Sequence, residues 1–296
     1  MPTTTERWAV QAYMTEHWRD QLGRFGVWRS GRQVTPDLAA SLEGLGYGAV
    51  WLGGSPGGDL AAVEDLLGAT TTLIVATGIV NIWQSDPHEV AASFARIEAA
   101  YPRRFLLGVG AGHPEATKQY VKPYDAIRRY LGVLIADGVP GRSMVLAALG
   151  PRMLRLAAER TAGVHPYLVP ASYSRQARQI LGPEPLLAVE HKAVIQADPD
   201  VARVIARPRV RPYLGLVNYT SNLRRLGFAD ADLAEPGSDA LIDALVAHGD
   251  PGHVAARLTE HLTAGADHVC VQLLTESGAD VLDGYRQLAA ALGLAA

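Results

Sequence analysis

The stretch IVATGIVNIW, Ile74 to Trp83, is typical of a buried strand, because its residues are apolar, uncharged and often β-branched. Gly78 interrupts the middle of this run, and the polar Asn81 follows it. Glycine weakens a strand interior, since it loses more backbone freedom on folding than other residues and packs no side chain. The sequence therefore predicts a local departure from regular strand structure at Gly78.

Apolar runs of this kind alternate with amphipathic runs along all 296 residues. Repeated alternation of strand and helix predicts a parallel sheet covered by helices, and eight such units fit a (β/α)8 TIM barrel. A doubly wound open sheet is the alternative, but the glycine-rich turn typical of that fold does not follow the first run. The eight expected strands cover residues 24–28, 48–54, 73–83, 104–112, 143–150, 163–169, 186–195 and 267–275.

The region after the seventh expected strand is longer than one barrel unit requires. From residue 198 to residue 266 one helical pattern follows another, including the run SDALIDALVAHG at 238–249. We interpret the surplus, roughly residues 207–250, as a helical insertion near the top face of the barrel. No linker composition or low-complexity segment is present, so we expect a single domain over residues 1–296.

Composition argues against several classes of function. The net charge of −3 gives no attraction to nucleic acid or to an anionic membrane surface. Cys270 is the only cysteine, so no internal disulfide can form. The N-terminal sequence lacks a signal-peptide pattern, and no apolar run reaches the ~18 residues that span a bilayer. We expect a cytoplasmic protein that acts on a small molecule, and its apolar barrel helices would permit a homodimer.

The chemistry of a (β/α)8 barrel belongs at the C-terminal ends of its strands. The expected ends are rich in glycine and aromatic residues, and we find no carboxylate pair, metal-spaced histidine cluster or serine-centred elbow. Such a rim suits a planar ring with a phosphate better than a hydrolytic reaction. In the turn ALGPRM, residues 148–153, free N–H groups at the helix start would bind phosphate and Arg152 would add positive charge. An ordinary loop-to-helix turn is the alternative.

Several motifs resemble the bacterial-luciferase-like flavin and deazaflavin oxidoreductases. They are IVATGIVNIW followed by DPHEVAASFARIEAAYPRRFLLGVGAG, and then VLAALGPRMLRLAAERTAGVHPYLV. With GGSPGGDL and NYTSNLRRLGF they are most similar to the branch that depends on the 5-deazaflavin cofactor F420. The resemblance spans nearly the whole chain and implies hydride transfer between F420 and a small organic substrate. An FMN-dependent monooxygenase and a non-catalytic cofactor-binding barrel are the alternatives.

The resemblance also implies which residues hold the cofactor. It matches the bond between Gly78 and Ile79 to a non-prolyl cis peptide, in a bulge that supports the concave face of the ring. An ordinary bulge with trans bonds is the alternative. The acidic tail of F420 would leave through an open exit, where the candidate cations are Arg152, Arg155, Lys118 and Lys122. The implied contacts to ring, ribityl chain and phosphate are Gly78, Ile79, Asn81, Ala111, Gly112, Leu149, Gly150, Arg152 and Met153.

Two histidines are further candidates. His113 follows the fourth expected strand, where sugar-phosphate dehydrogenases of this family carry a glutamate, and histidine can donate or accept a proton near neutral pH. His113 is therefore the candidate catalytic residue, and a loop histidine bonded only to backbone is the alternative. The second expected strand ends in Gly53–Gly54 instead of the Asp-His pair of those dehydrogenases, so their substrate and mechanism do not carry over. His165 and Tyr167 would face the same mouth, as cofactor or substrate contacts or as packed core residues.

Overall fold

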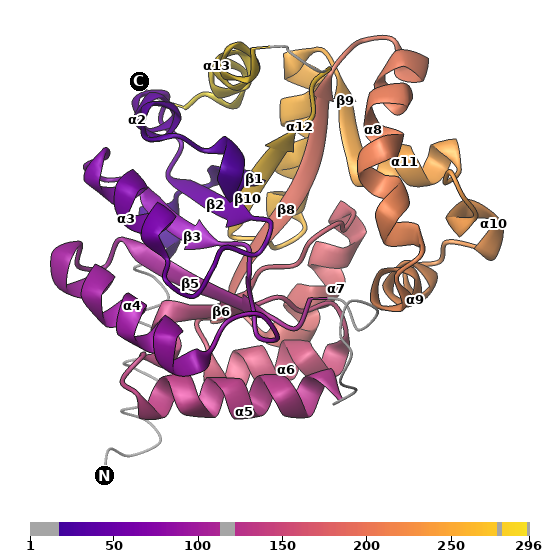
Figure 1. Cartoon of the computed structure of the whole chain (residues 1–296). Helices are drawn as coiled ribbons and strands as arrows, with labels where there is room; N and C mark the ends of the chain where they lie inside the picture. The colour runs from indigo at the N-terminus through magenta and orange to yellow at the C-terminus, as the bar shows by residue number, and fades with distance from the viewer. Residues whose placement is uncertain (1–17, 113–121, 277–279, 295–296) are drawn as a thin grey trace.

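The computed structural model describes residues 18–112, 122–276 and 280–294. Eight parallel strands form a closed barrel, and helices cover its outside (Figure 1). The strands follow the order β10-β1-β2-β3-β5-β6-β7-β8, and pairing between β10 and β8 closes the ring. This closure confirms the predicted (β/α)8 barrel and excludes the open-sheet alternative.

Each of the eight expected strands coincides with a barrel strand. The third one is divided, because β3 ends before Gly78 and the short β4 continues it. The barrel strands are β1 (Phe25–Ser30), β2 (Ala49–Gly53), β3 (Ile74–Thr77) with β4 (Val80–Asn81), β5 (Phe105–Gly110), β6 (Met144–Leu146), β7 (Gly163–Val164), β8 (Leu186–Ile195) and β10 (His268–Leu273).

The outer helices begin where the sequence places proline and capping residues. Asp86, for example, accepts hydrogen bonds from the N–H groups of His88 and Glu89 at the start of α4, which satisfies two donors that lack a partner within the helix. No helix in the described ranges is both long and apolar enough to cross a membrane. The outer helices are α2 (Pro36–Gly44), α3 (Ala61–Gly68), α4 (Pro87–Ala100), α5 (Pro123–Ala136), α6 (Pro151–Arg160), α7 (Ala171–Leu181), α12 (Pro251–Thr263) and α13 (Val281–Leu292), with 3-10 turns η1 (Gly31–Gln33) and η3 (Gly141–Ser143).

Four helices stand between β8 and the next strand, on one side of the barrel in Figure 1. They are α8 (Pro199–Leu214), α9 (Val217–Arg225), α10 (Asp230–Leu233) and α11 (Asp239–Leu245). These helices share an apolar cluster that also includes Leu168 and Leu274 from the barrel. The helical region therefore packs against the barrel mouth through its own hydrophobic contacts.

An additional strand, β9 (Val246–Gly249), was not expected from the sequence. The helical pattern predicted for 238–249 is wrong at its end, because α11 stops at Leu245 and the following residues pair with the end of β8. Lys192 and Ala193 of β8 pair with β10 on one edge and with β9 on the other. Since β7 pairs only with the first residues of β8, β9 occupies the edge that β7 leaves open.

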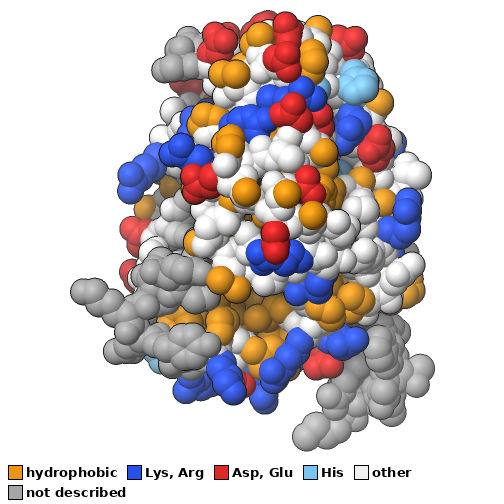
Figure 2. Space-filling view, turned by 90° about the vertical axis from the view of Figure 1, so that its right-hand side faces the viewer, with side chains coloured by type: hydrophobic (Ala, Val, Ile, Leu, Met, Phe, Trp, Pro, Cys, Tyr) orange, Lys and Arg blue, Asp and Glu red, His pale blue; other side chains and the backbone are white. Residues whose placement is uncertain are grey.

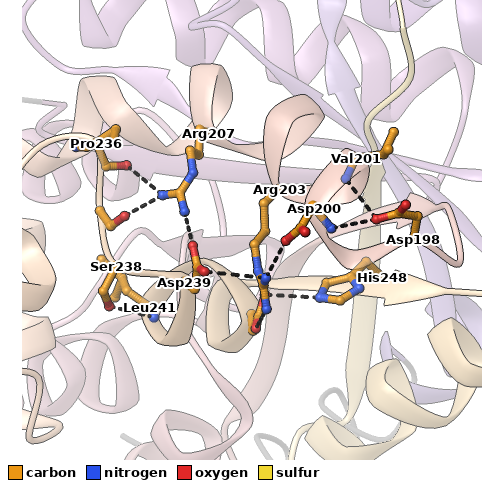
Figure 3. A network of polar contacts seen from close by, with 12 residues as sticks. Asp198, Asp200, Val201, Arg203, Arg207, Pro236, Ser238, Asp239, Leu241 and His248 are labelled. Atoms are coloured by element: carbon orange, nitrogen blue, oxygen red, sulfur yellow. Dashed lines mark hydrogen bonds and ion pairs between the residues drawn. The ribbon is translucent and has the colours of Figure 1, made fainter.

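A polar network ties α8 to α11 and β9 (Figure 3). The Arg203 guanidinium donates to both carboxylate oxygens of Asp243, at 2.9 and 2.6 Å. Asp243 also bonds the His248 imidazole at 3.0 Å, and Arg207 binds the Asp239 carboxylate. Exposed ion pairs contribute only ~0–1 kcal/mol each, so the network fixes orientation more than it adds stability.

The barrel interior below the mouth is filled by side chains that include Trp51, Ile74, Leu106 and Cys270. Trp51 is fully buried, and its ring stacks on the His165 imidazole with centroids 4.2 Å apart. Cys270 is also fully buried, as its apolar strand predicts. Packing of this kind fills the barrel below the mouth.

Candidate functional site

A pocket of about 1040 Å³ opens at the C-terminal ends of the strands. Strand ends form its floor, and α8 and α9 supply one wall. Figure 2 views the side that carries these helices: hydrophobic side chains gather in a hollow there, and Lys and Arg side chains lie along its lower rim. The predicted cofactor residues that line the pocket are Gly78, Ile79, Asn81, Ala111, Gly112, Leu149, Gly150, Met153 and His165.

The strand interruption at Gly78 is a bulge. Ala76 pairs with Leu106 and Val80 pairs with Val109, so four steps along this strand face three steps along β5. One residue is therefore extra, which is the definition of a β-bulge. The peptide bond of Gly78–Ile79 inside it is cis, as the resemblance implied.

The glycines of this floor leave room that any side chain would fill. A Cβ at Gly78 would lie 2.8 Å from Nε1 of Trp28 and 2.9 Å from Nε2 of His165. A Cβ at Gly110 would lie 2.8 Å from Cγ1 of Ile79. These separations are shorter than carbon contacts allow, so both positions require glycine. The packing around Gly78 leaves no room for a side chain at this point of the pocket lining, which explains the glycine within the apolar strand.

The start of α6 borders the pocket through Gly150 and Met153, and the N–H groups of Met153 and Leu154 already donate to the carbonyl of Gly150. Gly150 precedes Pro151, and a Cβ at Gly150 would lie 3.8 Å from the Arg225 guanidinium, which comes from α9. Arg152 was expected to supply the charge here, but its guanidinium lies 3.7 Å from the Tyr124 ring centroid and it does not line the pocket. Arg225 was not singled out from the sequence, because its approach to Gly150 depends on how α9 packs.

The pocket lining is positively charged. Arg29, Arg209 and Arg225 line it, and within the described residues no Asp or Glu does. The whole chain has a net charge of −3, so this local excess of cations is a property of the pocket. Of the cations expected at the exit, Lys122 and Arg155 are exposed, whereas Lys118 lies outside the described residues. An anionic ligand would be attracted to this mouth.

Tyrosines of the barrel and the inserted helices meet at one side of the floor. The Tyr167 hydroxyl donates to Oε1 of Gln272 at 3.0 Å and accepts from the Tyr213 hydroxyl at 3.1 Å. Beneath them Lys192 donates to Glu190 at 3.0 Å, and both side chains are fully buried. The pair is internal, and the lysine does not line the pocket.

The two histidine candidates, His113 and His165, differ in whether the structure describes them. His113 lies outside the described residues, so its catalytic role stays a prediction. His165 is buried and also lines the pocket, so the two interpretations from the sequence both apply to it. Burial lowers the pKa of His165 to about 4, and its imidazole is therefore neutral near pH 7.

Residues 30–134 match the luciferase-like monooxygenase family. No curated protein matches the chain. The resemblance predicted from the motifs is thus confirmed.

Solved structures share the fold over nearly the whole chain. An F420-dependent secondary alcohol dehydrogenase is 17% identical with a TM-score of 0.70, over 92% of this chain and 98% of that chain. The F420-dependent tetrahydromethanopterin reductase from Methanopyrus kandleri is 18% identical with a TM-score of 0.63, over 90% and 97%. The FMN-bound oxygenating constituent of 3,6-diketocamphane monooxygenase from Pseudomonas putida is 14% identical with a TM-score of 0.62, over 92% and 96%. At these identities the similarities show the shared barrel fold.

Proposed function

We propose that this protein is an F420-dependent oxidoreductase that transfers a hydride between F420 and a small organic substrate. The observation that carries the proposal is the glycine bulge with its cis peptide, which borders a pocket lined by arginines and by no described carboxylate. A planar ring fits the bulge, and an anionic tail fits the mouth. Bound F420 would supply the hydride chemistry at C5 of its ring, while the protein supplies orientation and a proton source.

The chain's own residues divide the binding of this cofactor between them. Gly78–Ile79 would support the ring face, and Gly150 at the start of α6 would lie along the phosphate. Arg225 and Arg209, which also line the pocket, would hold the negative charge of the phosphate and tail. Three arginines exceed what one phosphate needs, which favours F420, with its acidic tail, over FMN.

Titration of the protein with F420 and with FMN tests the proposal. We expect tighter binding of F420, and a strong dependence of its affinity on salt because charged groups contribute. Equal or tighter binding of FMN would overturn the cofactor assignment and favour the monooxygenase alternative.

His113 remains our candidate for the proton donor. His113→Ala should lower turnover by ~10²–10⁴-fold, the usual contribution of general acid catalysis, and leave the affinity for F420 nearly unchanged. Steady-state rates and F420 titration on the same variant measure both quantities. A smaller loss of rate would show that His113 is a loop residue without a role in proton transfer.

A further inference from the structure

Four aromatic side chains form a continuous surface along one side of the pocket, which we call the aromatic wall. They come from β1, from the loop after β7, and from α8 and α9, so the wall exists only where the inserted helices meet the barrel. Successive ring centroids along it lie 5.1, 5.3 and 5.0 Å apart, and the rings are tilted or edge-on to one another. All four residues line the pocket, and in this order they are Trp28, Tyr167, Tyr213 and Tyr219.

The wall keeps ring surface open to the pocket. Tyr167 and Tyr213 are half-buried, whereas Trp28 and Tyr219 are each 8% exposed. The wall begins beside the bulge, since the ideal Cβ position of Gly78 lies 2.8 Å from Nε1 of Trp28. None of the cofactor contacts that the resemblance implies belongs to the wall. A substrate held on it would therefore lie next to a cofactor ring held on the bulge.

The polar ends of the two central rings are engaged within the protein. The Tyr213 hydroxyl donates to the Tyr167 hydroxyl at 3.1 Å, and the Tyr167 hydroxyl donates to Oε1 of Gln272 at 3.0 Å. Both hydroxyl protons are thus already used. What these two side chains offer to a ligand is mainly the carbon surface of their rings.

A buried ion pair holds the centre of the wall. Nζ of Lys192 lies 3.8 Å from the centroid of the Tyr167 ring and donates to Oε1 of Glu190 at 3.0 Å. The other carboxylate oxygen of Glu190 accepts the N–H of Leu168, the residue after Tyr167, at 3.0 Å. Both charged side chains are fully buried and neither lines the pocket. Packing of rings does not require buried charges, which are costly to desolvate, so this pair indicates that the orientation of Tyr167 is fixed.

We propose that the aromatic wall binds an aromatic ring of the substrate, and that Tyr213 determines this specificity. Each aromatic ring has a negative face and a positive edge, so two rings attract each other beyond the effect of the apolar area that they bury. A saturated ring of the same size buries similar area without this attraction. The inference rests on the proposed function, because it names the class of substrate that would lie beside F420. The deazaflavin ring of the cofactor is the second source of the same chemistry.

The test titrates the full chain with benzamide and with cyclohexanecarboxamide, which share a neutral amide and differ in the ring. Binding is followed through the ring ¹H–¹³C NMR signals of Tyr167 and Tyr213. We expect benzamide to shift both signals and to bind roughly two- to tenfold more tightly, the range that one aromatic contact predicts. The hydrophobic effect alone gives the saturated ring equal or tighter binding, since its apolar surface is at least as large. Equal affinities, tighter binding of the saturated probe, or no shift at either signal overturns the proposal.

Three variants test whether the preference comes from the wall. Tyr213→Leu keeps an apolar side chain without a ring and should bring the two affinities within about twofold of each other. Tyr213→Phe keeps the ring and should retain the preference for benzamide. Tyr101→Leu is the matched control, because Tyr101 is also half-buried but does not line the pocket, and it should leave both affinities unchanged. A full preference for benzamide in Tyr213→Leu would refute the role of Tyr213.

A final arm separates the substrate from the cofactor as the source of the ring. The same titrations are repeated with F420 at saturation. If the wall takes the substrate, benzamide binds beside F420 with nearly unchanged affinity. If F420 excludes benzamide, the wall belongs to the cofactor and the substrate class is wrong. Failure of F420 to bind at all would end the proposed function, whereas a preference for benzamide without cofactor would still establish the wall as a site for an aromatic ligand.

Discussion

Two tryptophan–histidine pairs lie within one barrel and differ in hydrogen bonding: Trp51 with His268 is the closed pair, and Trp28 with His165 is the open pair. Trp51 and His268 satisfy each other, are fully buried and do not line the pocket. Trp28 and His165 are almost as buried but face the pocket with one atom each unpaired. The difference teaches that burial alone does not distinguish the two pairs, whereas hydrogen-bond satisfaction and access to the pocket do.

The largest expected effect tests whether the closed pair carries stability. Trp51→Ala removes a fully buried indole and leaves His268 without its donor, so the free energy of unfolding should fall by ~3–5 kcal/mol. Trp28→Ala should cost clearly less, since its side chain borders the pocket instead of being enclosed on all sides. Urea unfolding of both variants measures the two values. A larger loss for Trp28→Ala would break the comparison.

Acid should destabilise both pairs. Burial lowers the pKa of His165 and of His268 to about 4, below the ordinary value of 6.5. Between pH 6.5 and 4 the unfolded chain therefore binds protons that the folded protein does not, and stability falls as pH falls, by on the order of 1 kcal/mol per pH unit for each imidazole. Unfolding free energies at several pH values measure this slope. His268→Phe should reduce it, and an unchanged slope would contradict the assignment.

The arginines at the pocket mouth give a test that concerns cofactor binding and not the open pair. Arg225→Gln should weaken F420 binding roughly three- to tenfold, because an exposed cation near the α6 start is lost. Arg152→Gln is the matched control, because that guanidinium stacks on Tyr124. A greater loss with Arg152→Gln would return the phosphate contact to the residue that the sequence suggested.

The smallest effect is expected in the helices outside the barrel. Asp239→Asn weakens the ion pairs with Arg203 and Arg207, but these groups are partly exposed. The free energy of unfolding should therefore fall by less than ~1 kcal/mol. The same urea experiment measures it, with the loss for Trp51→Ala as the reference. A loss of comparable size would mean that the outer helices carry as much stability as the interior.

Local sequence signals predicted the barrel well, because each strand is an apolar run bounded by turns. The bulge was also accessible, since Gly78 is out of place in a β-branched run. The strand β9 was not, because its residues continue a helical pattern and only pairing with β8 makes them a strand. The approach of Arg225 to Gly150 and the pairing of Trp28 with His165 were missed for a related reason. Trp28 and His165 meet only when the barrel closes, and no local pattern records whether a buried nitrogen has found a partner.

Strand β9 has a consequence for how the molecule can be rebuilt. It returns the chain to β8, so the residues that leave the barrel after Ile195 and those that re-enter at Val246 are neighbours in one ladder. The segment between them forms one wall of the pocket, and both of its ends are fixed by the pairing of β8 with β9. Chain length between fixed points adds little entropic cost, growing only as a logarithm. We therefore expect this position to accept segments of different length and sequence, so that the pocket wall can be replaced while the barrel stays the same.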